Sequence, residues 1–118
     1  MGSGFGQYVR DARERRRVGD PSFSLRQLAQ RIGVEPSFLS KVERGEVAPP
    51  SEEKILRLAR ELGEDSDVLL ALAGKVSMDL QEAIRKRPEL FAGLIRQLKD
   101  MPDHAVLRVV REVRDGEW

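Results

Sequence analysis

The side chains best suited to chemistry in this sequence lie together in the first half of the chain. Pro36, Ser37, Ser40 and Lys41 are spaced so that they share one face of a helix. Short hydroxyl side chains let the backbone of such a helix approach base edges closely, and a lysine donates to a guanine or a phosphate oxygen. Arg44 follows at the end of the helix, where its guanidinium can pair with a phosphate. The pattern predicts non-covalent recognition of duplex DNA.

The sequence lacks the residue sets that covalent catalysis and metal binding require. It contains no cysteine and one histidine, His104, which stands in the first turn of an expected helix. Neither a glycine-rich phosphate loop nor an HExxH motif occurs, and no residue has ligand spacing to His104. We therefore expect no enzymatic activity, no cofactor and no metal, and we expect His104 to be exposed.

Two short helices joined by a tight turn are expected to position the polar face. Ser24 is a good N-cap, and apolar residues at i, i+3, i+4 and i+7 follow it. These residues are Leu25, Leu28, Ala29 and Ile32. Gly33 ends the first helix because it accepts a positive φ without steric cost. Pro36 suits the first turn of the second helix, where its missing N–H is not needed. Leu39 and Val42 then face inward and hold the second helix across the first.

The other segments also show helical spacing, and none alternates like a strand, so the predicted fold class is all-α. Further helices are expected at about 5–17, after Ser51, after Asp65 or Ser66, after Ser77, from Pro88 and from Pro102. Gly74-Lys75 is the expected boundary between a DNA-binding domain, 5–74, and a helical segment, 75–118. Because a few short helices bury little apolar surface alone, we interpret the Val and Leu stripe of this segment as a dimerisation seam.

Charge is distributed unevenly along the chain. Residues 1–50 hold nine Arg and Lys against six Asp and Glu, whereas the remaining residues hold twelve against fourteen. A basic first half indicates contact with phosphates.

The absence of cysteine favours a reducing compartment, and no apolar run approaches the ~20 residues that span a bilayer. We expect a cytoplasmic protein that does not contact membranes.

Residues 24–45 resemble the Cro/C1-type (Xre) helix-turn-helix transcriptional regulators, through the pattern S-L-R-Q-L-A-x-x-I-G-V-x-P-S-F-L-S-K-V-E-R-G. The resemblance covers about residues 5–73, and Ala29, the turn Gly33 and the closing E-R-G fall at the family spacing. It implies a five-helix, lambda-repressor-like DNA-binding domain in which the second helix of the motif is the recognition helix. It also implies an ion pair between Arg13 and Glu43 that fixes the first helix against the recognition helix. The residues expected to contact DNA are Ser24, Arg26, Gln27, Pro36, Ser37, Phe38, Ser40, Lys41 and Arg44.

Three features leave alternatives open. The segment Val18–Ser22 makes the first link longer than the usual family turn, and it either touches DNA or only lengthens the turn. Phe38 either packs on Arg44 and a sugar or covers the edge of the core. The C-terminal third is similar to that of a subgroup in which the later helices join two copies. Several members of that subgroup are encoded beside a metallopeptidase that inactivates the repressor by cutting it.

Together these patterns predict a repressor that binds double-stranded DNA as a homodimer, on an inverted-repeat operator. Two alternative functions remain. The chain is an antitoxin whose C-terminal segment binds a toxin, or it is an adaptor for which DNA is incidental. A metallopeptidase and a toxin are thus the further candidate partners.

Overall fold

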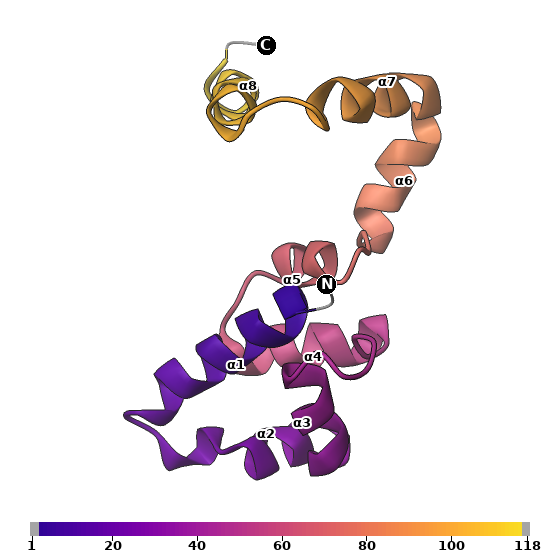
Figure 1. The fold of residues 1–118 in the computed structure, drawn as a ribbon. Helices are drawn as coiled ribbons and strands as arrows, with labels where there is room; N and C mark the ends of the chain where they lie inside the picture. Colours follow the sequence, from indigo (N-terminus) through magenta and orange to yellow (C-terminus); the bar gives the residue numbers. More distant parts are fainter. Residues whose placement is uncertain (1–2, 117–118) are drawn as a thin grey trace. The chain divides into compact units, whose positions relative to one another are not determined.

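The computed structural model describes residues 3–116, and the chain forms two compact units, Met1–Ser77 and Met78–Trp118. Over the described residues the structure is helical, without a strand, which confirms the predicted fold class (Figure 1). The first unit contains α1 (Ser3–Arg17), the 3-10 turn η1 (Pro21–Phe23), α2 (Leu25–Ile32), α3 (Pro36–Glu43), α4 (Glu52–Leu62) and α5 (Ser66–Leu72). The second contains α6 (Met78–Lys86), α7 (Pro88–Leu98) and α8 (Asp103–Asp115). Residues 75–77 group with the first unit, and the last two residues of the expected segment 75–118 lie outside the described residues.

The helix ends of the first unit follow from local capping. The Ser24 hydroxyl accepts a hydrogen bond from the Gln27 N–H at 3.2 Å, and Ser51 caps α4 in the same way. At Asp65 a carboxylate oxygen accepts from two backbone N–H groups at the start of α5. The predicted last helix differs slightly, because Pro102 is its N-cap and the first helical residue is Asp103.

All five helices of the first unit contribute to one core. Its largest fully buried side chains are Phe5, Val9, Leu28, Ile32, Leu39, Val42, Ile55, Leu58, Leu62, Leu69 and Leu70. Helix α1 contacts α3, α4 and α5, while α2 contacts α3 and α4. A buried Leu or Ile side chain contributes roughly 1.5–3 kcal/mol through burial alone, so this core accounts for how the short α2 and α3 stay helical.

The long link after α1 is anchored rather than loose. Phe23, at the end of η1, is buried, and the Arg16 and Arg31 guanidinium carbons lie 5.5 and 4.9 Å from its ring centroid. Such cation–π contacts stabilise both partners. Arg31 also donates to the Ser22 carbonyl and to Glu61, both at 2.6 Å. Val18, before the turn, is 91% exposed. The link is therefore exposed to solvent at its start and buried at its end.

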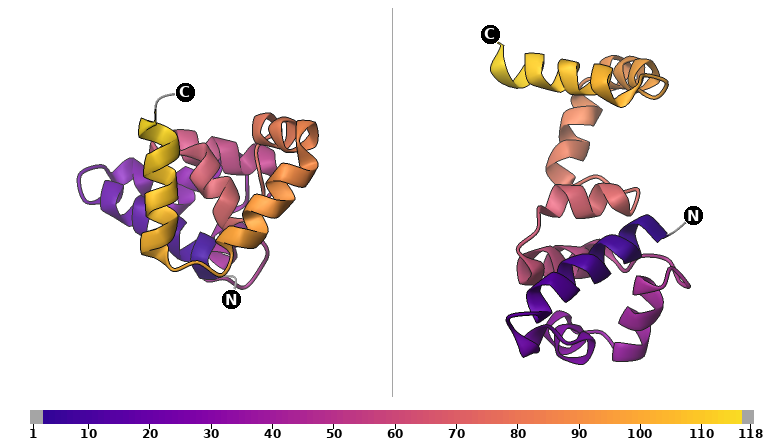
Figure 2. Two further views of the ribbon diagram at one scale, coloured as in Figure 1. Left: turned by 90° about the horizontal axis from the view of Figure 1, so that it is seen from above. Right: turned by 60° about the vertical axis from the view of Figure 1, so that its left-hand side comes forward.

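The helices of the second unit do not enclose a core. Among its described residues, α6, α7 and α8 bury no side chain. Large apolar side chains are exposed on all three helices; they include Leu80, Leu90, Leu94, Ile95, Leu107 and Val110. A groove of about 450 Å³ has an apolar lining that includes Leu94 and Leu98 of α7 and Val109 of α8. Figure 2 shows the ribbons of these two helices, in orange and yellow. No helix in the described part of the chain is long and apolar enough to cross a bilayer.

Candidate nucleic-acid interface

The turn between α2 and α3 has the tight geometry that the sequence predicts. Gly33 adopts φ 78°, ψ 38°, a left-handed conformation that side chains with a Cβ rarely adopt. Its N–H and that of Val34 then donate to the carbonyls of Gln30 and Ala29 at 3.2 and 3.0 Å. Ala29 is fully buried, as expected for a small residue where two helices approach closely. This turn fixes the direction of α3.

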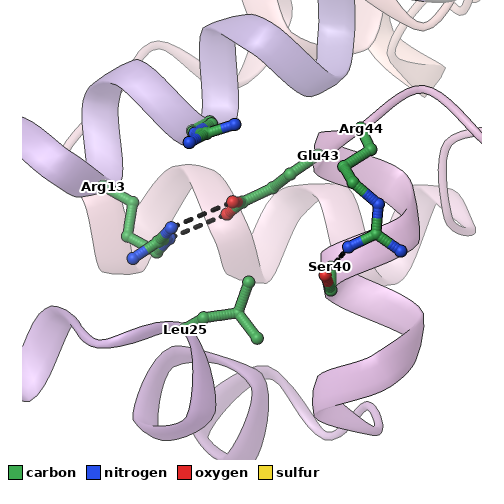
Figure 3. Close-up of a pocket in the computed structure, with 6 residues that line it drawn as sticks. Arg13, Leu25, Ser40, Glu43 and Arg44 are labelled. Atoms are coloured by element: carbon green, nitrogen blue, oxygen red, sulfur yellow. Dashed lines mark hydrogen bonds and ion pairs between the residues drawn. The ribbon is translucent and has the colours of Figure 1, made fainter.

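A buried ion pair joins α1 to the end of α3. The Arg13 Nε and Nη2 atoms lie 2.8 and 3.0 Å from the two Glu43 carboxylate oxygens (Figure 3). Arg13 Nη1 also donates to the Phe23 carbonyl at 3.2 Å. Their side chains are only 5% and 4% exposed. The hydrogen bonds that Arg13 donates to Glu43 raise the pKa of Arg13 above its ordinary value. The pair implied by the family resemblance is therefore confirmed.

A glycine that sequence reasoning missed lets α1 sit directly on α3. A Cβ placed on Gly6 would lie 2.2 Å from the Val42 carbonyl oxygen and 2.8 Å from that of Glu43. Both obstacles are backbone atoms at the C-terminal end of α3, so they cannot rotate aside. Because Gly6 lies within an ordinary helical pattern, no signal in the sequence distinguished it from a tolerated helix glycine.

The predicted recognition helix exposes part of its expected face. Ser37 and Lys41 are exposed, and Pro36 and Ser40 are half-buried. The Ser40 hydroxyl accepts a hydrogen bond from Arg44, whose guanidinium also pairs with Glu46. This pairing lowers the pKa of Glu46 and raises that of Arg44.

The remaining predicted contact residues are divided between the surface and the core. Arg26 and Gln27 are exposed at the start of α2, beside the half-buried cap Ser24. Phe38 is half-buried and packs against the core, in keeping with the interpretation that it covers the core edge.

His104 is exposed, as predicted. No group of three or more metal-binding side chains occurs among the residues that the structure describes.

Residues 5–73 match a family model described as a helix-turn-helix domain. The chain belongs to this family. Two curated Mycobacterium tuberculosis proteins, from strains CDC 1551 and H37Rv, are each 39% identical over 69 residues and described as uncharacterized HTH-type transcriptional regulators. The match covers 58% of this chain and 45% of theirs, so the chain spans about half the length of these relatives. The Xre-like resemblance of this helix-turn-helix chain is thereby confirmed.

One solved structure is also similar to this helix-turn-helix chain. It is the crystal structure of the clp gene regulator ClgR from Corynebacterium glutamicum, and the match covers 85% of this chain and 95% of the ClgR chain. The two sequences are 24% identical, and the TM-score is 0.48.

Proposed function

We propose that the chain is a sequence-specific DNA-binding regulator that represses transcription as a homodimer on an inverted-repeat operator. One observation carries the proposal: α3 is held from behind by the Arg13–Glu43 pair, while Ser37 and Lys41 on its opposite side are exposed. A helix so presented fits the major groove, which is about 12 Å wide. Arg26, Gln27 and Arg44 flank that helix and serve as the phosphate contacts that set its register.

The apolar surface of the second unit supports a second copy of this chain as the dimer partner. Helices α6 to α8 bury no side chain alone, although Leu90, Ile95 and Leu107 are apolar and more than half exposed to solvent. Short helices without a core are marginal in water. A second copy supplies an equal apolar face across a twofold axis, and that symmetry places two recognition helices ~34 Å apart on an inverted repeat.

The proposal is tested by selecting bound sequences from a random duplex library with purified protein at near-physiological salt. Enrichment of an inverted repeat supports a dimeric sequence-specific regulator, and its half-site spacing gives the dimer geometry. Enrichment of an unpaired half-site contradicts the dimer. No enrichment by folded protein contradicts sequence-specific binding and favours the adaptor function, or an antitoxin that binds DNA only with its toxin.

Lys41→Ala is expected to change the sequence preference. Loss of a base-edge contact costs about 1–3 kcal/mol of discrimination at one position of each half-site, while binding to unrelated DNA persists. Repeating the selection with the variant measures the change. Lys86→Ala, which removes an exposed lysine from α6, is the matched control and should leave the preference unchanged. An unaltered preference in Lys41→Ala would show that Lys41 does not read bases.

Val110→Asp is expected to convert the dimer to a monomer. Val110 lines the apolar groove between α7 and α8 and is 50% exposed, so a carboxylate there would be buried unpaired in the dimer. Sedimentation equilibrium measures the mass of each variant. Val18→Asp makes the same change at a residue that is 91% exposed in the first unit, and it should leave the dimer intact. If Val110→Asp stays dimeric, the seam lies on another surface.

A further inference from the structure

A cationic cavity opens between α1, the start of α2 and the end of α3. Its volume is about 280 Å³, and Figure 3 shows the arrangement of its labelled side chains. The lining residues are Arg10, Arg13, Leu25, Ser40, Glu43 and Arg44. Three arginines against one glutamate give this lining a net charge of +2. A concave surface with a net charge of one sign concentrates ions of the opposite sign, so the cavity suits an anion.

Arg10 is the arginine of this cavity that has no hydrogen-bond or ion-pair partner among the described residues. Arg13 is occupied by Glu43 and the Phe23 carbonyl. Arg10 precedes it by three residues on α1, which places both on the same face of the helix. Arg10 is exposed and makes no hydrogen bond or ion pair within residues 3–116. Within that part of the chain, its positive charge is therefore not paired with a carboxylate.

The second available cation is Arg44, because its present partners are exchangeable. Its guanidinium pairs with Glu46, and the two side chains are 49% and 51% exposed. Exposed ion pairs of this kind contribute little to stability. A phosphate can accept two parallel hydrogen bonds from a guanidinium. Exchange of Glu46 for a phosphate would leave no buried charge, and the Ser40 hydroxyl could then donate to the same anion.

We propose that this cavity binds one phosphodiester of the DNA backbone, held by Arg10 of α1 and Arg44 at the end of α3. The inference rests on the proposed function and adds α1 to the DNA-binding surface. Ser40, in the cavity wall, is followed directly by Lys41 on the exposed face of α3. The cavity thus borders the face that enters the groove. A contact to the backbone sets register without reading sequence.

The test compares Arg10→Ala with Arg15→Ala, using fluorescence anisotropy with the selected duplex and an unrelated duplex over a range of NaCl concentrations. Arg15 is an exposed arginine of the same helix that does not line the cavity. Arg10→Ala should reduce affinity for both duplexes roughly tenfold for each bound protomer, because each protomer loses one charged hydrogen-bond contact. The slope of log K against log salt should fall by about 0.9 for each bound protomer. Arg15→Ala should change both quantities much less, and Arg10→Lys should restore most of the slope.

The other outcomes separate this inference from the function on which it rests. If the unmodified chain binds duplex DNA and both alanine variants give the same slope, the phosphate site is wrong and the proposed function stands. If the unmodified chain binds no duplex, both are wrong. Inorganic phosphate is titrated separately while the Arg10 Nε resonance is followed by NMR. A shift of that resonance, with an unchanged DNA salt slope in Arg10→Ala, would assign the cavity to a free phosphate and overturn the backbone assignment.

Discussion

Gly6→Ala is expected to lower the free energy of unfolding by about 3 kcal/mol, the upper part of the usual range for overpacking. Alanine in a helix interior ordinarily makes a protein more stable than glycine does, by about 1 kcal/mol. The expected loss of stability is therefore opposite in sign to the change that helix propensity alone predicts. The reason is the position of the added Cβ, 2.2 Å from the Val42 carbonyl oxygen. Only a shift of α1 away from α3 relieves that clash. Urea unfolding followed by circular dichroism measures the change.

The control for this prediction is Gly4→Ala, in the same helix. A Cβ on Gly4 meets no atom within 4 Å, so this variant should be as stable as the unmodified chain or slightly more so. Equal stability of Gly6→Ala and Gly4→Ala would contradict the close seating of α1 on the end of α3. The same shift should also weaken the proposed DNA binding, because α1 packs against α3, the predicted recognition helix.

Glu43→Ala is the second substitution with a large expected effect. Removing one partner of a buried ion pair leaves the other charge without compensation, which costs about 3–5 kcal/mol. Here the remaining charge is Arg13, whose side chain is 5% exposed and which keeps only the neighbouring Glu14, 46% exposed, as an ion-pair partner at 3.2 Å. Small domains are stable by only about 5–15 kcal/mol, so the loss is a large share of the total. Thermal and urea unfolding of the variant measure it.

Two further variants show whether the uncompensated charge causes this loss. Glu53→Ala breaks the exposed pair between Glu53 and Arg57 and should change stability little. The double variant Arg13→Met with Glu43→Leu removes both charges, and it should recover much of the stability that Glu43→Ala loses. A double variant as unstable as Glu43→Ala would assign the loss to packing or to the hydrogen bond with Phe23 instead.

The helix-turn-helix motif was predictable because its determinants are local. The cap at Ser24, the apolar spacing of α2, the turn at Gly33 and the proline at the start of α3 each follow from neighbours in sequence. The Arg13–Glu43 pair spans 30 residues, and only the family resemblance indicated it. Lys41 was predicted to be on the free face because helical spacing alone places it opposite Leu39 and Val42.

The remaining features depend on how distant segments pack. The contact at Gly6 and the cavity at Arg10 both arise where α1 meets the end of α3, and neither leaves a periodic signal. Phe23 lies in a link that shows no helical spacing, so its burial between two arginines was not predicted. In the second unit the apolar stripe was predictable from helical spacing, but that spacing does not identify the second copy of the chain that we propose as its partner.

The anchored link after α1 makes the chain easy to label at one chosen point. Because the sequence contains no cysteine, a single Val18→Cys change would introduce its sole thiol. That position is 91% exposed, and a Cβ on the neighbouring Gly19 meets nothing within 4 Å. Downstream, Asp20 and Phe23 fix the chain again, so a fluorophore attached at residue 18 would report from a defined place without entering the core. The extra length of this link thus provides a ready attachment point for spectroscopy.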